Sequence, residues 1–159
     1  MGIHSEKYLI SVLVLCVYAI GNSSIAENLH SASQKQQQKK YYVEDIKKAM
    51  SEHIENQIDE DGIFHLYDDK TGENLFLIFV KIHDPVRVIN SNTYFACTDF
   101  KVVGEGNKLY DLDFWMSPVD GVLKVFKTKI HKEPRKSLIY GWYKQPRYTF
   151  VNDKIVPLY

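Results

Sequence analysis

The stretch that decides the fold runs from Lys108 to Met116 and reads KLYDLDFWM. Successive side chains of a β-strand point to opposite faces, so these residues divide into two sets. The apolar set, which we expect to face the core, consists of Tyr110, Leu112, Phe114 and Met116. Asp111 and Asp113 fall on the opposite face. This alternation predicts a strand with one face buried.

Segments with strand character lie on both sides of this stretch. They are residues 63–67, 75–82, 93–103 and 122–131, followed by shorter candidates at 138–143 and 148–151. The run 75–82 is almost continuously apolar, which is typical of a central strand buried on both faces. Glycine-containing turns at 104–107 and 118–121 predict that neighbouring strands pair as antiparallel hairpins.

One amphipathic helix is expected before the strands, at about residues 41–58. Its apolar residues recur at steps of three and four: Val43, Ile46, Met50, Ile54 and Ile58. We expect Ile46, Met50 and Ile54 to hold this helix on the sheet, because a helix covers a core with its apolar stripe.

One helix followed by four to five antiparallel strands predicts an α+β fold, in which an N-terminal amphipathic helix packs on a curled antiparallel sheet. Over about residues 41–151, the order and length of these elements resemble the cystatin fold and its NTF2-like relatives. Cystatins inhibit cysteine proteases through a Gln-x-Val-x-Gly hairpin and a later Pro-Trp pair. The nearest hairpin here, residues 101–106, lacks the glutamine, and the Pro-Trp pair is missing. The resemblance therefore implies a cystatin-like fold without protease inhibition.

Residues 1–26 have the layout of a secretory signal peptide. An uncharged, mostly apolar run at 8–20 follows Lys7, and small residues precede the expected cut after Ala26. This run is shorter than the roughly 20 residues that span a bilayer, and an uncleaved anchor or a lipid on Cys16 are the alternatives. We therefore predict a periplasmic or secreted protein that has no stable membrane span after cleavage.

The remaining chain is expected to consist of a flexible polar linker, residues 27–40, and a single domain, residues 41–159. The cleaved chain keeps one cysteine, Cys97, so it has no internal disulfide. Cys97 lies in a strand-like run, where we expect it to be a small buried residue. An intermolecular disulfide and a reactive thiol are the alternatives.

The histidines show no metal-binding spacing. His65, His83 and His131 could meet Asp84 or Asp99 only if the fold brings them together, because no two histidines have His-x-His or His-x-x-x-His spacing. No pair of cysteines remains after signal cleavage to bind zinc or an iron–sulfur cluster. We therefore predict no metal site and no cofactor.

The formal net charge is zero, but the two signs are unevenly distributed along the chain. Residues 41–120 contain 7 basic and 16 acidic side chains, whereas residues 121–159 contain 9 basic and 2 acidic ones. Two interpretations are open: the basic strands lie beside acidic strands and neutralise them, or a basic face attracts an anionic partner. The candidate binding residues for the second interpretation are Lys132, Arg135, Lys136, Trp142, Lys144 and Arg147. The expected partner is an exported protein or an anionic surface, and the predicted export argues against nucleic acid.

Asp111 and Asp113, together with His131, form an alternative polar site. Two carboxylates on one strand face can bind a cation or share a proton. If instead the turn at 117–121 aligns Asp111 with Lys127, the two carboxylates belong to an ordinary solvated sheet face. No catalytic spacing is present, so we predict an exported, non-enzymatic binding or protein-interaction module. The alternative is a small ligand carrier or enzyme with a pocket between the helix and the sheet.

Overall fold

The computed structural model describes residues 39–158, which form one α-helix and nine β-strands. The predicted signal peptide, residues 1–26, and residues 27–38 of the predicted linker lie outside the described residues. The elements in chain order are α1 (Val43–Glu55), β1 (Phe64–Asp68), β2 (Glu73–Ile82), β3 (Arg87–Asn90), β4 (Thr93–Val102), β5 (Glu105–Val119), β6 (Val122–Ser137), β7 (Gly141–Pro146), β8 (Tyr148–Val151) and β9 (Lys154–Pro157).

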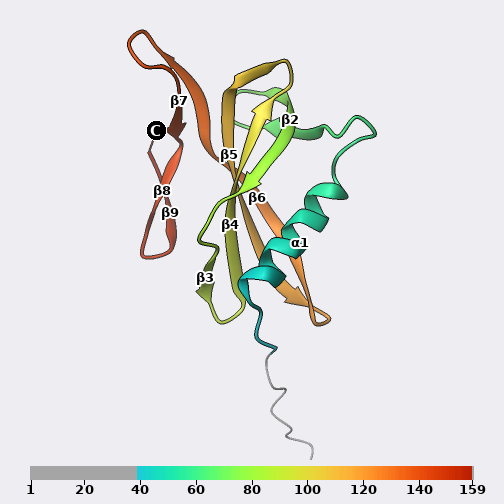
Figure 1. Cartoon of the computed structure of the whole chain (residues 1–159). Coiled ribbons are helices and arrows are strands. Elements are labelled where there is room, and N and C mark those ends of the chain that lie inside the picture. Colours follow the sequence, from blue (N-terminus) through green and yellow to red (C-terminus); the bar gives the residue numbers. More distant parts are fainter. Residues whose placement is uncertain (1–38, 159) are drawn as a thin grey trace, which may run out of the picture. The chain divides into compact units, whose positions relative to one another are not determined.

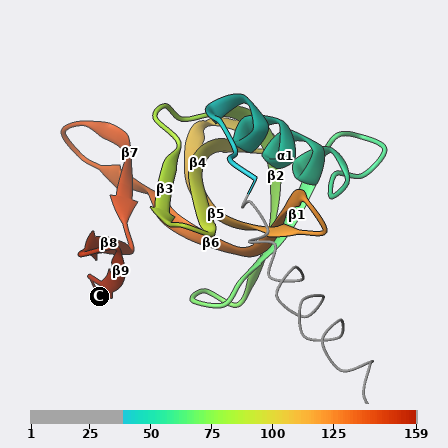
Figure 2. The same cartoon turned by 90° about the horizontal axis from the view of Figure 1, so that it is seen from below.

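Seven of these strands form one antiparallel sheet in the order β1-β2-β4-β5-β6-β7, with β3 paired to β4 beside β2. Strands β8 and β9 form a separate two-stranded sheet. The large sheet curls, and α1 lies across its concave side (Figures 1 and 2). The core of the domain fills the space between them.

The predicted fold class, an α+β domain with a helix on four to five strands, is therefore wrong. Strands make up 62% of the described residues and helix 11%, so the fold is β-rich. Two short strands account for part of the difference. Both β3 and β9 lie in segments that were not expected to be strands, and β3 follows Asp84-Pro85, which is typical of a connection.

The predicted packing of the helix is confirmed. Ile46, Met50 and Ile54 are buried on the sheet side of α1. They belong to one core cluster with the fully buried rings Phe100 and Phe114 from the sheet. Because those rings fill the concave side, the interface between helix and sheet is packed core.

The register between β5 and β6 differs from the predicted one. Asp120 and Gly121 have φ angles of 52° and 76°, which is the backbone of a two-residue type I′ hairpin turn. Strand β5 therefore continues through Pro118, and Val119 pairs directly with Val122. Bulges at Phe126 and His131 of β6 shift the register further, so Asp111 lies opposite Lys132 and the predicted alignment of Asp111 with Lys127 is wrong.

Burial of the strands also differs from the sequence pattern. The predicted central strand, β2, has one exposed face, because Phe76 and Val80 are about half exposed. Strand β5 is instead buried on both faces from Tyr110 to Met116. Asp111 and Asp113 are each 0% exposed, so the interpretation of a solvated face is wrong. The second face of β5 is covered by chain that follows β6, including Tyr148 and Phe150.

The buried stripe of α1 leads to a stability prediction. Substituting Ile54→Ala should lower the free energy of unfolding by about 2–5 kcal/mol, because it removes buried methyl groups and leaves a cavity. Chemical denaturation measures this change. The control, Val43→Ala, removes a partly exposed side chain of the same helix and should change stability by less than about 0.5 kcal/mol. Equal effects of the two substitutions would contradict this packing.

Candidate functional site

Polar chemistry gathers on the face of β4, β5 and β6 that points away from α1. The apolar part of this face is a small cluster in which Phe95 and Trp115 pack against Tyr148 from β8. The polar part holds Cys97 and Asp99 of β4 together with Asp111 and Asp113 of β5. In the antiparallel register Cys97 lies directly opposite Asp113, and Asp99 lies directly opposite Asp111. We refer to these four residues as the far-face cluster.

A β-bulge in β6 completes the far-face cluster. Asp111 pairs with Lys132 while Leu112 pairs with Ile130, so His131 is the extra residue of β6. Ile130 belongs to the main core, and both His131 and Lys132 reach the far-face carboxylates. Strict alternation would separate two consecutive residues onto opposite faces, whereas the bulge puts both on one face.

Lysines neutralise Asp99 and Asp111. Lys144 of β7 lies 2.7 Å from Asp99 and 2.5 Å from Asp111, and Lys132 lies 2.7 Å from the other oxygen of Asp111. His83 adds a contact of 2.9 Å to Asp99. Burial opposes ionisation of Asp99, but hydrogen bonds from Lys144 and the other neighbours outweigh it, so the pKa of Asp99 lies below its ordinary value.

Asp113 has different neighbours. The hydroxyl of Tyr148 donates a hydrogen bond of 2.5 Å to Asp113 Oδ2, and His131 Nδ1 lies 3.4 Å from the same oxygen. Cys97 Sγ lies 4.0 Å from His131 Nδ1. Burial, together with the nearby charge of Asp113, raises the pKa values of the Cys97 thiol and the Tyr148 hydroxyl. Both groups are therefore protonated at neutral pH.

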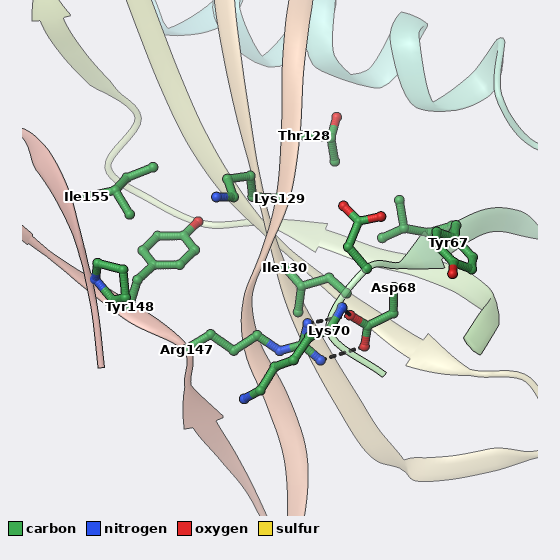
Figure 3. Close-up of a pocket in the computed structure, with 12 residues that line it drawn as sticks. Tyr67, Asp68, Lys70, Thr128, Lys129, Ile130, Arg147, Tyr148 and Ile155 are labelled. Atoms are coloured by element: carbon green, nitrogen blue, oxygen red, sulfur yellow. Dashed lines mark hydrogen bonds and ion pairs between the residues drawn. The ribbon is translucent and has the colours of Figure 1, made fainter. Parts of the chain in front are cut away.

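A second charged group surrounds Arg147, at the junction of β7 and β8. Figure 3 shows the Arg147 guanidinium reaching Asp68 at the end of β1, with nitrogen–oxygen distances of 2.5 and 2.6 Å. Arg147 also contacts Glu133 at 2.5 Å, and Glu133 accepts a hydrogen bond of 2.8 Å from Arg135. Asp68 and Glu133 are almost completely buried. This group ties β1, β6 and the β7–β8 junction together.

A cleft of about 270 Å³ lies beside Arg147. The end of β1, the middle of β6 and the β8–β9 hairpin line it, with Tyr148 and Ile155 on one side and Tyr67 on the other (Figure 3). Pockets for drug-sized ligands are typically about 300–1,000 Å³, so this cleft is small for that purpose. Its guanidinium is already bound by Asp68 and Glu133, which weakens the case for an anion site there.

The structure separates the predicted basic binding residues into two groups. Lys132, Lys144, Arg135 and Arg147 all contact buried carboxylates. Lys136 and Trp142 lie instead next to the β6–β7 turn, directly opposite each other on β6 and β7. The first interpretation of the charge asymmetry therefore accounts for four of the five basic residues among the predicted binding residues, because these four contact acidic residues of β1, β4, β5 and β6.

Sequence reasoning missed the most exposed apolar residues of the domain. Leu138, Ile139 and Tyr140 form the turn between β6 and β7 and are 105%, 83% and 82% exposed. The predicted short strand at residues 138–143 includes them, whereas the structure has a turn there. The sequence does indicate a turn here, because Ser137 before these residues and Gly141 after them are residue types that favour turns.

Comparisons with protein-family models, curated proteins and solved structures found no match for this chain. The predicted resemblance to cystatins and their relatives consequently stays a prediction. Helix α1, the helix within residues 39–158, lacks the length and apolar character that a membrane span requires.

The contacts of Arg147 predict a large cost for removing its buried partner. Asp68→Asn should lower the free energy of unfolding by about 3–5 kcal/mol, because breaking a buried ion pair leaves an uncompensated charge. Chemical denaturation at pH 7 measures the change. The control, Asp153→Asn, alters a half-exposed pair with Arg87 and should cost at most about 1 kcal/mol. A cost for Asp68→Asn no greater than that of the control would refute the importance of this pair.

The same contacts predict a pH dependence. Burial disfavours the charged forms of Asp68 and Glu133, but Arg147 and their other partners outweigh it, so both pKa values lie below the ordinary 3.8 and 4.5. Groups with a lowered pKa in the folded state stabilise it at higher pH, and this contribution disappears as the pH falls through the folded-state pKa. The stability difference between the native protein and Asp68→Asn should therefore shrink as the pH falls below about 4, in denaturation series from pH 7 to pH 3. A constant difference would contradict the lowered pKa of Asp68.

Proposed function

We propose that this chain is an exported, non-enzymatic binding module that docks onto a partner protein through the tip of the β6–β7 hairpin. The observation that carries this proposal is the exposure of Leu138, Ile139 and Tyr140, three consecutive apolar residues at that tip. Single exposed apolar residues are ordinary on protein surfaces, whereas a contiguous set is characteristic of an interaction site.

The hairpin tip is ordered as well as exposed. Ser137 Oγ accepts hydrogen bonds from the backbone N–H groups of Ile139 and Tyr140, at 3.2 and 3.3 Å. Both views of the domain show this hairpin extending away from α1 and from the central strands (Figures 1 and 2). A turn fixed before binding loses less conformational entropy on docking, so its apolar contacts contribute more to affinity.

The charges around the tip define the chemistry of the partner. Lys136 is exposed and makes no ion pair with any residue in 39–158, and the side chain of Arg135 is about half exposed. Trp142 and Tyr143 present partly exposed rings on the neighbouring strand. These features fit a protein surface with an apolar depression and an acidic rim, because opposite charges at the rim steer association.

The interior supports a binding role over the alternative, a carrier or enzyme with a pocket between helix and sheet. Phe100, Phe114 and Met50 are each 0% exposed and fill that space. The carboxylates Asp111 and Asp113, which that alternative places in the pocket, lie on the opposite face of β5. Asp99 and Asp111 are also held by lysines, so they are poorly placed to act as a general acid or base.

A site-specific photocrosslinker tests the docking site. Placed at Ile139 of the exported protein, it should join the chain to an acidic protein, whereas the same group at Val122 should not. Binding of that purified protein should then weaken at least about tenfold in the variant Leu138→Ser, Ile139→Ser, Tyr140→Ser, because hot-spot residues each contribute about 2 kcal/mol or more. Thermal denaturation should show nearly unchanged stability, since these side chains are exposed.

A matched variant controls for the loss of exposed apolar surface in general. Val122→Ser with Phe126→Ser removes two side chains, each more than half exposed, from another part of β6. This variant should bind the partner like the native protein. Equal weakening by both variants would contradict the assignment to the hairpin tip. Crosslinking to lipid, with binding to anionic vesicles, would replace the proposed protein partner by a membrane surface.

A further inference from the structure

Asp113 is unusual among the buried carboxylates. Residues 39–158 contain five of them: Asp68, Asp99, Asp111, Asp113 and Glu133. Each of the other four has a lysine or arginine nitrogen within ion-pair distance, but Asp113 has only His131, at 3.4 Å. Buried charges in proteins are paired or coordinate metal ions, whereas Asp113 lacks the lysine or arginine contact that its neighbours have. Lys129, its register partner on β6, places its ammonium over the ring of Tyr148 instead.

One oxygen of Asp113 also lacks a hydrogen-bond partner. Asp113 Oδ2 accepts the hydrogen bond of Tyr148, whereas Asp113 Oδ1 is buried without a partner. Asp111 Oδ2 likewise lacks a hydrogen bond, but Lys132 Nζ lies 2.7 Å away and compensates its charge. An unsatisfied buried carboxylate oxygen is costly, and a water molecule or a bound ion can satisfy it. The other oxygen, Asp113 Oδ2, is the one that lies near His131.

The groups that converge beside Asp113 are metal-ligand types. Cys97 Sγ, a nitrogen of His131 and a carboxylate oxygen of Asp113 lie within 4.8 Å of one another. The separations from His131 Nδ1 are 4.0 Å to the sulfur and 3.4 Å to Asp113 Oδ2. In a tetrahedral zinc site, bond lengths of about 2.0–2.3 Å place such atoms roughly 3.3–3.6 Å apart. The nitrogen–oxygen separation therefore fits already, and the sulfur needs to approach by about 0.4 Å.

The same geometry argues against a cysteine nucleophile with a histidine base. In such a constellation one imidazole nitrogen faces the nucleophile and the other faces the orienting carboxylate. Here Cys97 and Asp113 both approach Nδ1 of His131. Three ligand atoms that converge in this way suit a shared cation. A proton relay through the imidazole would need both ring nitrogens, whereas Cys97 and Asp113 approach the same one.

We propose that Cys97, Asp113 and His131 form a binding site for a zinc-like divalent cation. Each ligand comes from a different strand, β4, β5 or β6, and the bulge at His131 brings the third ligand to the other two. Thiolate, imidazole and carboxylate together match the ligand preferences of Zn²⁺. Binding displaces the thiol proton of Cys97 to solvent and leaves a fourth position for water or an external ligand. Tyr148 supports the site through its hydrogen bond to Asp113.

A neighbouring set of residues is a weaker candidate. His83, Cys97 and Asp111 also converge, but Asp111 is already in contact with Lys132 and Lys144. A divalent cation there would meet two ammonium groups at close range. His83 is moreover engaged by Asp99 at 2.9 Å. His83 is thus a matched control for His131, since each is a partly buried histidine within reach of Cys97 and of a far-face carboxylate.

The test uses the exported protein purified without a histidine tag, stripped with a chelator and kept reduced. Titration with Co²⁺ should give a thiolate-to-cobalt absorption band that Zn²⁺ abolishes, and Zn²⁺ should raise the thermal midpoint, since it binds the folded state. Cys97→Ser should abolish the band. His131→Ala should weaken Zn²⁺ binding by more than the roughly 10–100-fold expected for Tyr148→Phe, which removes only a supporting hydrogen bond.

The control variant His83→Gln should bind Co²⁺ and Zn²⁺ like the native protein, with circular dichroism confirming that every variant is folded. If the native protein shows neither the band nor a zinc-dependent rise in its thermal midpoint, the site does not exist and His131 is simply a neighbour of Asp113. Loss of binding in His83→Gln with binding retained in His131→Ala would overturn the proposed ligand set. These results are independent of the hairpin tip, because none of the proposed ligands lies in it.

Discussion

Burial of charged side chains on the face of the central strands that points away from α1 is the constraint on which the C-terminal half of the domain depends. Asp111 and Asp113 are fully buried on a strand whose other face already packs on the core. A buried carboxylate is costly unless a cation compensates it, and the chain after β6 supplies compensation. Lys144 reaches Asp99 and Asp111, and Arg147 reaches Asp68 and Glu133. The placement of β7 and of the β7–β8 junction is thus coupled to charge as well as to apolar packing.

This coupling explains why the charge asymmetry of the sequence was a poor guide to the surface. The basic region after residue 121 and the acidic region before it are complementary parts of one interior. Folding joins Asp68 and Arg147, which are 79 residues apart, through two hydrogen bonds between guanidinium and carboxylate. No local sequence pattern predicts this contact. These buried ion pairs occupy charged side chains that the sequence alone suggests are available to a partner. The exposed lysines that remain, Lys124, Lys127, Lys129, Lys136 and Lys154, are spread over β6 and β9, and only Lys136 lies beside the exposed apolar residues of the β6–β7 turn.

Local patterns predicted local structure well. The spacing of Ile46, Met50 and Ile54 identified the buried face of α1, because helical periodicity is visible in a single segment. The far-face cluster depends on register, and register depends on the exact turn. The two-residue turn at Asp120-Gly121 shifts the register by three residues, and bulges at Phe126 and His131 add one residue each, so the partner of Asp111 is Lys132 and not Lys127. The bulge at His131 then turned two consecutive residues to one face, and no alternation rule anticipates that.

The residues on this face also determine how the central strands can be cross-linked. The described domain holds one cysteine, Cys97, so its central strands are joined by packing and ion pairs without an internal disulfide. Cys97 and Asp113 are direct neighbours across β4 and β5, and His131, the bulge residue two positions beyond the register partner of Asp113, reaches Asp113 from β6. A cation bound by these three residues would connect the three central strands at the point where charge compensation is missing. It would act as a lysine does for Asp111, and it would stabilise the folded state because the three ligands are brought together only there. A bound metal ion would then supply the positive charge that a lysine or arginine supplies to the other buried carboxylates.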